Sequence, residues 1–196
     1  MNSRDIVKSR ISELSEILPK FETACADSLA LAGSLLIDTF NSGSKVLICG
    51  NGGSAADSQH FAAEFVSAFS RDLNRRALPA IALTVDTSIL TAFSNDFGFE
   101  NVFARQVEAY GRSGDLLIVL TTSGSSKNCL AAVREAKIRG LKTIALTQSS
   151  GAVGLEVDVA IGVPSSNTQH IQECHMMAYH ILTEIVEIAL FQKRET

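Results

Sequence analysis

Apolar side chains recur along the chain with two different periods. Over residues 4–41 they return mostly every three or four positions, which is the period of an amphipathic helix. Pro19 lies inside this stretch and Gly43 follows it. Because proline interrupts helices and glycine commonly follows their last residue, we predict a helical hairpin over residues 1–42 that is divided at Pro19.

The middle of the chain alternates short apolar runs with helical patterns, and one long helix from about Thr168 to Gln192 follows. Near-continuous apolar strands between helices predict a parallel sheet that is covered on both faces. We therefore predict a single α/β domain over residues 1–196, with a doubly wound sheet of about five strands within residues 43–196. The predicted strands are 45–49, 80–83, 116–120, 143–146 and 157–163, and the predicted helices between them are 54–68, 87–94, 100–110 and 126–139.

Composition narrows the class of protein. The chain has 17 basic and 21 acidic residues, a net charge of −4, and no basic run longer than Arg75-Arg76, so we expect no nucleic-acid partner. The four cysteines form no CxxC pair, which predicts buried free thiols in a reducing compartment. The longest apolar runs are of strand length, and the start of the chain lacks the apolar block of a signal peptide. We therefore expect a cytoplasmic protein without a membrane-spanning segment.

Two predicted strands run into polar loops that directly precede helices. The first loop reads Cys49-Gly-Asn-Gly-Gly-Ser-Ala-Ala-Asp, and the second reads Thr121-Thr-Ser-Gly-Ser-Ser. Free backbone N–H groups and the positive end of the helix dipole favour an anion at such a point. One run of hydroxyl residues is usually only a helix cap. Two of them at neighbouring strand ends favour a phosphate-binding site.

A dinucleotide fold is the main alternative for the first loop, because Gly50-x-Gly52-x-x-Ala55 loosely fits its glycine pattern. That pattern expects an acidic residue about 20 positions later. Here the second strand ends near Asp86, and 86 − 50 = 36 positions separate it from Gly50. The chain also lacks a P-loop Gly-Lys-Ser/Thr, so the nucleotide interpretation is rejected.

Ionisable side chains gather on the helix that follows the first loop and on the final helix. His60 and Glu64 are four residues apart and share one helix face, while Gln172 and His180 lie on the final helix. Conversion of a ketose to an aldose needs a base for a carbon-bound proton and an acid for the oxygens. A glutamate and a histidine fill these roles without an organic cofactor. The four residues together are alternatively able to ligate a metal, for which two imidazoles and a carboxylate suit zinc.

The spacing of Gln172 and His180 limits how a metal site can form. They are eight residues apart, about 12 Å along a straight helix. Either the helix bends, or the site collects residues from more than one subunit. We prefer a site at a subunit interface, since the terminal helices carry more apolar surface than one small sheet needs.

At these residues the sequence resembles the sedoheptulose-7-phosphate isomerase (phosphoheptose isomerase) family, whose members carry the sugar isomerase (SIS) fold. The likeness covers nearly the whole chain. It rests on motifs that occur in order and at matching spacing: Cys49-Gly-Asn-Gly-Gly-Ser, His60-Phe-Ala-Ala-Glu64, Leu78-Pro-Ala-Ile-Ala-Leu, Asn95-Asp-Phe-Gly-Phe, Thr121-Thr-Ser-Gly-x-Ser, Ile171-Gln-Glu-x-His175 and His180.

The resemblance implies a flavodoxin-like five-stranded parallel sheet and a homotetramer with active sites between subunits. It implies cytoplasmic conversion of sedoheptulose 7-phosphate to D-glycero-D-manno-heptose 7-phosphate, the first step towards nucleotide-activated heptose for surface polysaccharide such as lipopolysaccharide. Glu64 and His180 would be the acid/base pair, and one zinc per subunit would be held by His60, Glu64, Gln172 and His180. The implied phosphate ligands are Ser54, Thr121, Thr122, Ser123 and Ser126, and the other implied substrate contacts are Asn51, Gly52, Gly53, Asn95, Asp96 and Gln172.

Two departures and three rival functions remain open at this point. Many family members have an arginine where this chain has Ala68, and an arginine or lysine where it has His170; both changes bear on substrate preference. The rivals are a non-catalytic SIS protein that binds the replication initiator DnaA, a regulatory sugar-phosphate sensor, and an isomerase of another sugar phosphate. The first two do not need Glu64 and His180, so an isomerase is favoured.

Overall fold

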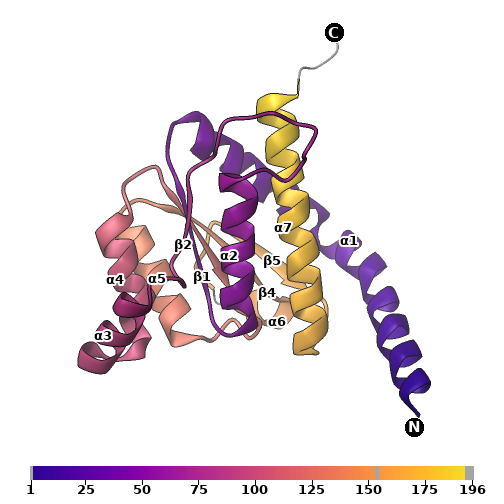
Figure 1. Ribbon diagram of the computed structural model, residues 1–196. Coiled ribbons are helices and arrows are strands. Elements are labelled where there is room, and N and C mark those ends of the chain that lie inside the picture. The colour runs from indigo at the N-terminus through magenta and orange to yellow at the C-terminus, as the bar shows by residue number, and fades with distance from the viewer. Residues whose placement is uncertain (1, 153–154, 193–196) are drawn as a thin grey trace.

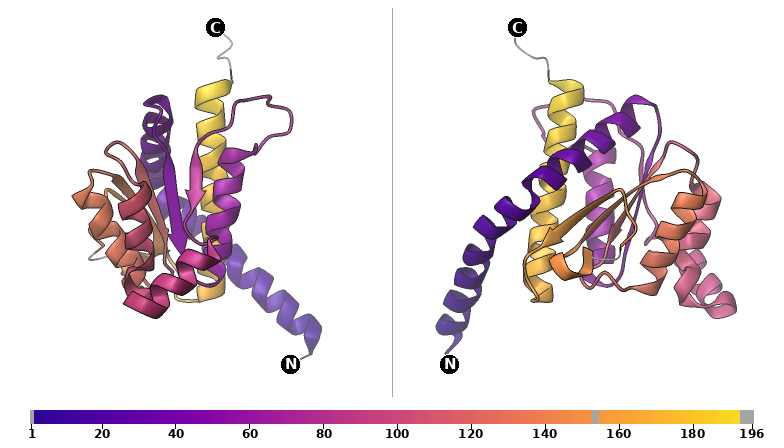
Figure 2. Two further views of the ribbon diagram at one scale, coloured as in Figure 1. Left: turned by 60° about the vertical axis from the view of Figure 1, so that its left-hand side comes forward. Right: turned by 180° about the vertical axis from the view of Figure 1, so that it is seen from behind.

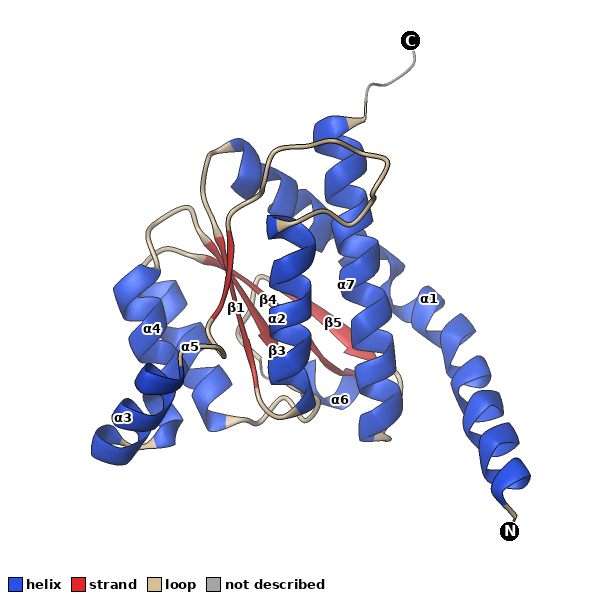
Figure 3. Ribbon diagram, in the orientation of Figure 1, coloured by secondary structure: helices blue, strands red, loops and turns tan. Residues whose placement is uncertain are grey.

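A parallel sheet of five short strands forms the centre of the molecule (Figure 1, Figure 3). The computed structural model describes residues 2–152 and 155–192, so the remaining residues of the predicted 1–196 domain lie outside the described part. The strand order is β2-β1-β3-β4-β5, which is the flavodoxin-like order and confirms the predicted fold class. The strands are β1 (Val46–Gly50), β2 (Ala80–Ala82), β3 (Leu116–Leu120), β4 (Lys142–Gln148) and β5 (Val159–Val163).

The sheet separates two layers of helices, because alternate strand residues face opposite sides. Ile48 and Ile118 pack in the larger core under α1 (Ser3–Asn41), α2 (Gly53–Val66) and α7 (Thr168–Phe191). Leu47 and Leu117 pack in the second core. That core is covered by α3 (Thr87–Phe97), α4 (Val102–Tyr110) and α5 (Lys127–Ile138), with a 3-10 turn at Phe99–Asn101 and a short α6 (Ser149–Ala152) completing the described helices.

The register of the central strands places the two polar loops side by side. Val46 pairs with Leu116, and Gly50 at the end of β1 pairs with Leu120 at the end of β3. All five residues of each strand are buried, which is why the sequence shows unbroken apolar runs there. The loops that follow β1 and β3 therefore leave the same edge of the sheet from adjacent positions.

The predicted helical hairpin is wrong, because α1 runs unbroken through Pro19. Pro19 has no N–H group to donate to the carbonyl of Ser15, so the helix loses one hydrogen bond there. Ser15 is exposed, so water can donate to that carbonyl instead. Beyond it, Phe21 and Leu36 anchor the helix in the core. The predicted end at Gly43 is confirmed by a φ of +75°. The first turns of α1 project away from the sheet (Figure 2).

The other predicted elements are found within three residues of their predicted ends. The predicted helix 100–110 is divided into the 3-10 turn and α4, and α6 has no predicted counterpart. The four cysteines are free and buried, as predicted, and burial raises the pKa of Cys25 and Cys174 to about 11.

Two helices are long and apolar enough to cross a membrane by length and composition alone. They are α1 and α7, and 39% and 44% of their apolar 18-residue windows are buried inside the fold. Helices in the core of a soluble protein pass the same test, so this observation is weak support for a membrane span.

Candidate active site

The first polar loop leads straight from β1 into α2 and forms a tight turn. Gly52 has a φ of +57°, which only glycine adopts without strain, and precedes α2 without any side-chain cap. A Cβ on Gly53 would lie 2.7 Å from Nε2 of Gln172, so the start of α2 packs closely against the Gln172 side chain of α7. Ser54 is buried at the first turn of α2. No side chain caps the start of α2, and the N–H groups of Ser54 and Ala55 donate to the backbone carbonyls of Asn51 and Gly52.

The second polar loop connects β3 to α5 and is built from hydroxyl groups that bond mainly to one another. Oγ1 of Thr121 donates to Oγ of Ser126 over 3.2 Å, and Oγ of Ser125 donates to Oγ of Ser123 over 2.9 Å. Ser126 is the N-cap residue of α5, but its side chain makes no capping bond. Gly124 turns the loop with a φ of +69°. Hydroxyl groups therefore lie beside the N-terminus of α5, where the helix dipole favours an anion.

A reciprocal pair of amides ties the two loops together. The side chain of Asn51 donates to Oδ1 of Asn128 over 2.9 Å, and the side chain of Asn128 donates to Oδ1 of Asn51 over 2.8 Å. Asn128 is buried. The resemblance implies that Asn51 contacts the substrate, and in the structure its amide bonds to Asn128. Sequence reasoning missed Asn128 altogether.

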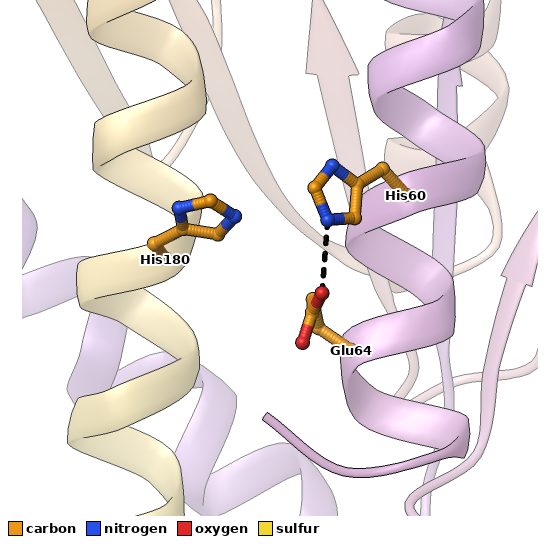
Figure 4. A group of neighbouring side chains, drawn as sticks. All are labelled: His60, Glu64 and His180. Carbon is orange, nitrogen blue, oxygen red and sulfur yellow. Dashed lines mark hydrogen bonds and ion pairs between the residues drawn. The ribbon is translucent and has the colours of Figure 1, made fainter. Parts of the chain in front are cut away.

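Three ionisable side chains meet between α2 and α7 (Figure 4). Nε2 of His60 lies 2.9 Å from Oε1 of Glu64, and the rings of His60 and His180 are 5.2 Å apart. One ligand atom from each of the three lies within 4.8 Å of the other two. His60 is exposed, while Glu64 and His180 are partly buried, so the cluster opens to solvent. The structure thus brings together both predicted acid/base residues and three of the four predicted metal ligands.

The same cluster supplies a donor set for a divalent metal. Two imidazole nitrogens and one carboxylate oxygen match the three-ligand pattern of catalytic zinc sites, which keep a fourth position open. The donor atoms lie further from one another than the ligands of a single bound ion do. A small movement of the side chains towards one another would bring all three within reach of one ion. These residues therefore suit zinc, both in their ligand types and in the closeness of their ligand atoms.

Two further polar residues border the cluster, and sequence reasoning missed both. The hydroxyl of Tyr179 lies 2.9 Å from Nδ1 of His60, and the tyrosine ring stacks on Phe61. Burial, together with the charges of Asp57 and Glu64, raises the pKa of Tyr179 far above its usual value, so it stays a hydroxyl. Burial also raises the pKa of Asp57, although the charge of His60 opposes this. Two features of the sequence could have indicated them: Tyr179 directly precedes His180, and Asp57 lies three residues before His60.

Gln172 lies nearer the N-terminal ends of α2 and α7 than the cluster of His60, Glu64 and His180 does. Because Gly53 touches Gln172 and His60 touches Tyr179, α2 and α7 run side by side in the same direction. Gln172 is therefore beside the first polar loop, whereas His180 is beside His60. Within one chain the structure does not bring Gln172 to the three-residue cluster, and the difficulty raised by its spacing from His180 persists.

Asn95 and Asp96 lie on α3, which covers the opposite face of the sheet (Figure 1). Both are exposed, and the Asn95 amide donates to Oδ1 of Asp96 over 2.8 Å. Asp96 lines a surface hollow between α3 and α4 together with Phe97 and Arg105. The structure does not bring these two predicted substrate contacts to the loops or to the cluster of the same chain.

The residues that depart from the family pattern have structural contacts. The side chain of Arg75 is fully buried, pairs with Glu187 and donates to the backbone carbonyls of Glu64 and Phe65, so it is not free to replace the arginine absent at Ala68. His170 bonds Glu173 over 2.7 Å and Glu13 over 3.2 Å, which joins α7 to α1. These two hydrogen bonds raise the pKa of His170.

Comparison with known proteins agrees with the geometry. The SIS domain family model matches residues 11–148. A phosphoheptose isomerase of Roseiflexus sp. (strain RS-1) is 55% identical over 159 residues, 81% of this chain and 80% of that protein. One from Citrifermentans bemidjiense is 43% identical over 188 residues, 95% of this chain and 97% of that protein.

Solved structures resemble the chain over nearly its full length. The phosphoheptose isomerase of Neisseria gonorrhoeae has a TM-score of 0.88 and 38% identity, covering 95% of this chain and 99% of its own. That of Francisella tularensis has a TM-score of 0.89 and 38% identity, covering 95% of this chain and 98% of its own.

Proposed function

The chain belongs to the phosphoheptose isomerase family of SIS-domain proteins, and from this premise we propose that it converts sedoheptulose 7-phosphate to D-glycero-D-manno-heptose 7-phosphate. The observation that carries the proposal is the cluster of His60, Glu64 and His180 between α2 and α7, with α2 beginning at the first polar loop. An isomerase needs an anion site for its substrate and an acid/base pair for proton transfer, and this cleft offers both.

The phosphate group of the substrate docks where the two polar loops meet. Ser54, Thr121 and Ser126 supply hydroxyls there, and the first turns of α2 and α5 supply N–H groups. Ser54 and Glu64 are ten residues apart on α2, about 15 Å along the helix. A sugar whose phosphate and carbonyl lie at opposite ends of a long chain suits that separation better than a triose phosphate does.

The chemical step moves one proton between adjacent carbons. Glu64 takes a proton from carbon 1 while the oxygen on carbon 2 gains one, which gives an enediol. Glu64, whose proton exchanges with solvent in this open cleft while the enediol is bound, then delivers a proton to carbon 2 as the oxygen on carbon 1 loses its own, which gives the aldehyde. His180 assists the proton transfers at oxygen or the opening of the sugar ring. The step is balanced without an oxidant or a reductant.

Zinc is the cofactor that this donor set suits, and no organic cofactor is needed. His60, Glu64 and His180 would hold the ion, with Gln172 as a fourth ligand only if another subunit supplies it or the helix adjusts. When bound, zinc polarises the substrate carbonyl. If zinc is required, complete chelation abolishes turnover and added zinc restores it. Activity unchanged by complete chelation would leave the metal without a catalytic role.

A homotetramer with active sites between subunits would explain why some of the predicted site residues lie apart within one chain. Gln172 is apart from His180, and Asn95 and Asp96 lie on the far face of the sheet, so a neighbouring subunit could bring the separated residues together. Exposed apolar side chains on α1, such as Ile6 and Ile11, supply surface for such contacts. Sedimentation analysis tests this, and a monomer at working concentration would contradict it.

We further place the enzyme in the cytoplasm, at the first step of nucleotide-activated heptose synthesis for surface polysaccharide such as lipopolysaccharide. The free, buried thiols support a reducing compartment. Growth of a deletion strain with altered surface heptose would support the pathway, and wild-type heptose content would contradict it.

The direct test of the activity is turnover of sedoheptulose 7-phosphate by the purified protein, followed by NMR. We expect the aldoheptose phosphate to accumulate, and slower turnover of pentose and hexose phosphates under the same conditions. Faster turnover of a shorter sugar phosphate would change the assigned substrate. No turnover of any sugar phosphate, with and without zinc, would contradict the proposal and favour the DnaA-binding relative.

A further inference from the structure

Helix α6 lies directly against the second polar loop, at the edge of the sheet where β4 ends (Figure 3). A Cβ on Gly124 of the loop would lie 2.4 Å from the carbonyl oxygen of Gly151 on α6 and 2.7 Å from its Cα. A Cβ on Gly151 would lie 2.9 Å from the carbonyl oxygen of Ser123 and 2.6 Å from Oγ1 of Thr147. Except for that hydroxyl, these atoms belong to the backbone, which cannot rotate away as a side chain can. The loop and α6 therefore meet backbone to backbone, with no room for a side chain between them.

The part of the loop that α6 contacts is the part that arranges the hydroxyl groups. Oγ of Ser123 accepts from the backbone N–H of Ser125 over 3.2 Å and from its Oγ over 2.9 Å. The N–H of Gly124 donates to the carbonyl oxygen of Thr121 over 3.2 Å, which closes the turn. A displacement of Ser123 and Gly124 therefore moves the hydroxyls of Ser123 and Ser125 and the approach of the chain to Ser126.

The position of α6 is fixed from its other side as well. Oγ of Ser149, its first residue, donates to the carbonyl oxygen of Gly162 on β5 over 2.8 Å. A Cβ on Gly162 would lie 3.0 Å from Cα of Ser149, so α6 also packs closely on the backbone of β5. At the end of β4, the N–H of Gln148 donates to the carbonyl oxygen of Thr122 over 3.2 Å. Because α6 is held between β5 and the loop, it cannot make room for added bulk without breaking these contacts.

We propose that α6 is a fixed support that holds the second polar loop in the shape that binds a phosphate monoester, and that Gly151 is the positioning residue at their contact. A loop that is already held in its binding shape loses less freedom when the ligand arrives, which strengthens binding without any new contact to the ligand. Gly151 has no side chain with which to bind phosphate, so it acts through Ser123 and Gly124. The identity of the ligand rests on the proposed function, whereas the contact between α6 and the loop is a feature of the structure itself.

Gly151→Ala tests the proposal, because its methyl group would press on the backbone of Ser123. Ser150→Ala is the matched control, since Ser150 is the exposed neighbour on α6. The first readout is the affinity for inorganic phosphate, measured by titration with the amide NMR signals of the loop. Added bulk at a close-packed contact displaces the backbone, so we expect about tenfold weaker phosphate binding in Gly151→Ala and wild-type binding in Ser150→Ala.

The second readout is steady-state kinetics with sedoheptulose 7-phosphate. Phosphate is held equally before and during the chemical step, so KM should rise by about the same factor in Gly151→Ala while kcat changes by about twofold at most. A merely structural role for Gly151 would instead lower the urea midpoint and the fraction of active enzyme, with KM unchanged.

A folded Gly151→Ala with wild-type phosphate affinity would overturn the proposal, and so would a wild type whose loop signals do not respond to phosphate. If Gly151→Ala does not fold, Ser149→Ala is the second variant. It removes the hydrogen bond to Gly162 without adding bulk, so we expect a smaller loss of phosphate affinity, and no loss would overturn the proposal. If phosphate binding follows these expectations but no sugar phosphate is turned over, only the proposed function is contradicted.

Discussion

Two clusters of charged side chains lie where α2 and the segment after it pack against α7, and the clusters differ in how fully their polar atoms are satisfied. Near the end of α2, the side chains of Arg75 and Glu187 are 0% and 3% exposed. Glu187 accepts from Arg75 and from the backbone N–H groups of Phe69 and Ser70. In the other cluster Glu64 bonds to His60, whose side chain is 43% exposed. Among the described residues, His180 there has ring contacts but no hydrogen-bond partner.

The difference separates a structural role from a chemical one. Burial raises the pKa of Glu187, but the hydrogen bonds from Arg75, Phe69 and Ser70 lower it by more, so the carboxylate stays charged and closed to any ligand. Glu64 keeps free acceptor capacity beside two imidazoles in an open cleft. A carboxylate with unmet capacity can take a proton or a cation, whereas a saturated one holds the fold together.

The same substitution in the two clusters should give opposite results. Glu64→Gln keeps the shape of the side chain but removes the base, and we expect turnover to fall by about 10³-fold. The unfolding midpoint in urea should stay close to that of the wild type. Glu156→Gln, at an exposed carboxylate, is the control and should retain activity. Substantial turnover by Glu64→Gln would remove Glu64 from the chemistry.

Glu187→Gln should instead destabilise the protein. It leaves the buried guanidinium of Arg75 without a countercharge, which costs about 3 kcal/mol in comparable pairs. Urea unfolding measures the free energy directly. A cost below about 1 kcal/mol, in the range of surface ion pairs, would show that this cluster does not support the fold.

His175 on α7 provides a comparison of buried with open histidines. Burial lowers its pKa from 6.5 to about 4, so the folded protein binds this proton less readily than the unfolded chain. The stability that depends on it is present above pH 6.5 and is lost as the pH falls towards 4. By linkage, this group alone should remove about 2 kcal/mol between pH 7 and pH 5. Urea unfolding at both pH values should show that loss in the wild type and a smaller one in His175→Gln. Equal losses would contradict it.

The smallest effect is expected for the pair of amide side chains that joins the two polar loops. Asn128→Ala removes both amide hydrogen bonds to Asn51, worth about 1 kcal/mol in net terms. If the amide pair holds the phosphate site in shape, KM for the sugar phosphate rises about fivefold while kcat changes little. Steady-state kinetics measures both constants. A fall in kcat with KM unchanged would place the pair in the chemistry instead.

Much of the fold could be predicted because the strands are buried on both faces. Runs such as Leu116–Leu120 are apolar without interruption, and the polar loops that follow them mark their ends. The continuous path of α1 could not be predicted, because the local effect of Pro19 is outweighed by core contacts of residues far along the chain.

Only part of the site could be predicted from the sequence. Helical spacing places His60 and Glu64 on one face, but their meeting with His180 depends on the packing of α7 against α2. The contact between Tyr179 and His60 spans 119 positions and has no local signature. The same holds for Asn51 and Asn128, which meet only because β1 and β3 are neighbours.

The central claim is that Glu64 moves a carbon-bound proton of the sugar phosphate. The most direct measurement is exchange of the hydrogens at carbons 1 and 2 with solvent deuterium, followed by NMR for the wild type and Glu64→Gln at equal concentration. The account predicts deuterium at these carbons during wild-type turnover and none above background with the variant. Exchange by Glu64→Gln at the wild-type rate would contradict it.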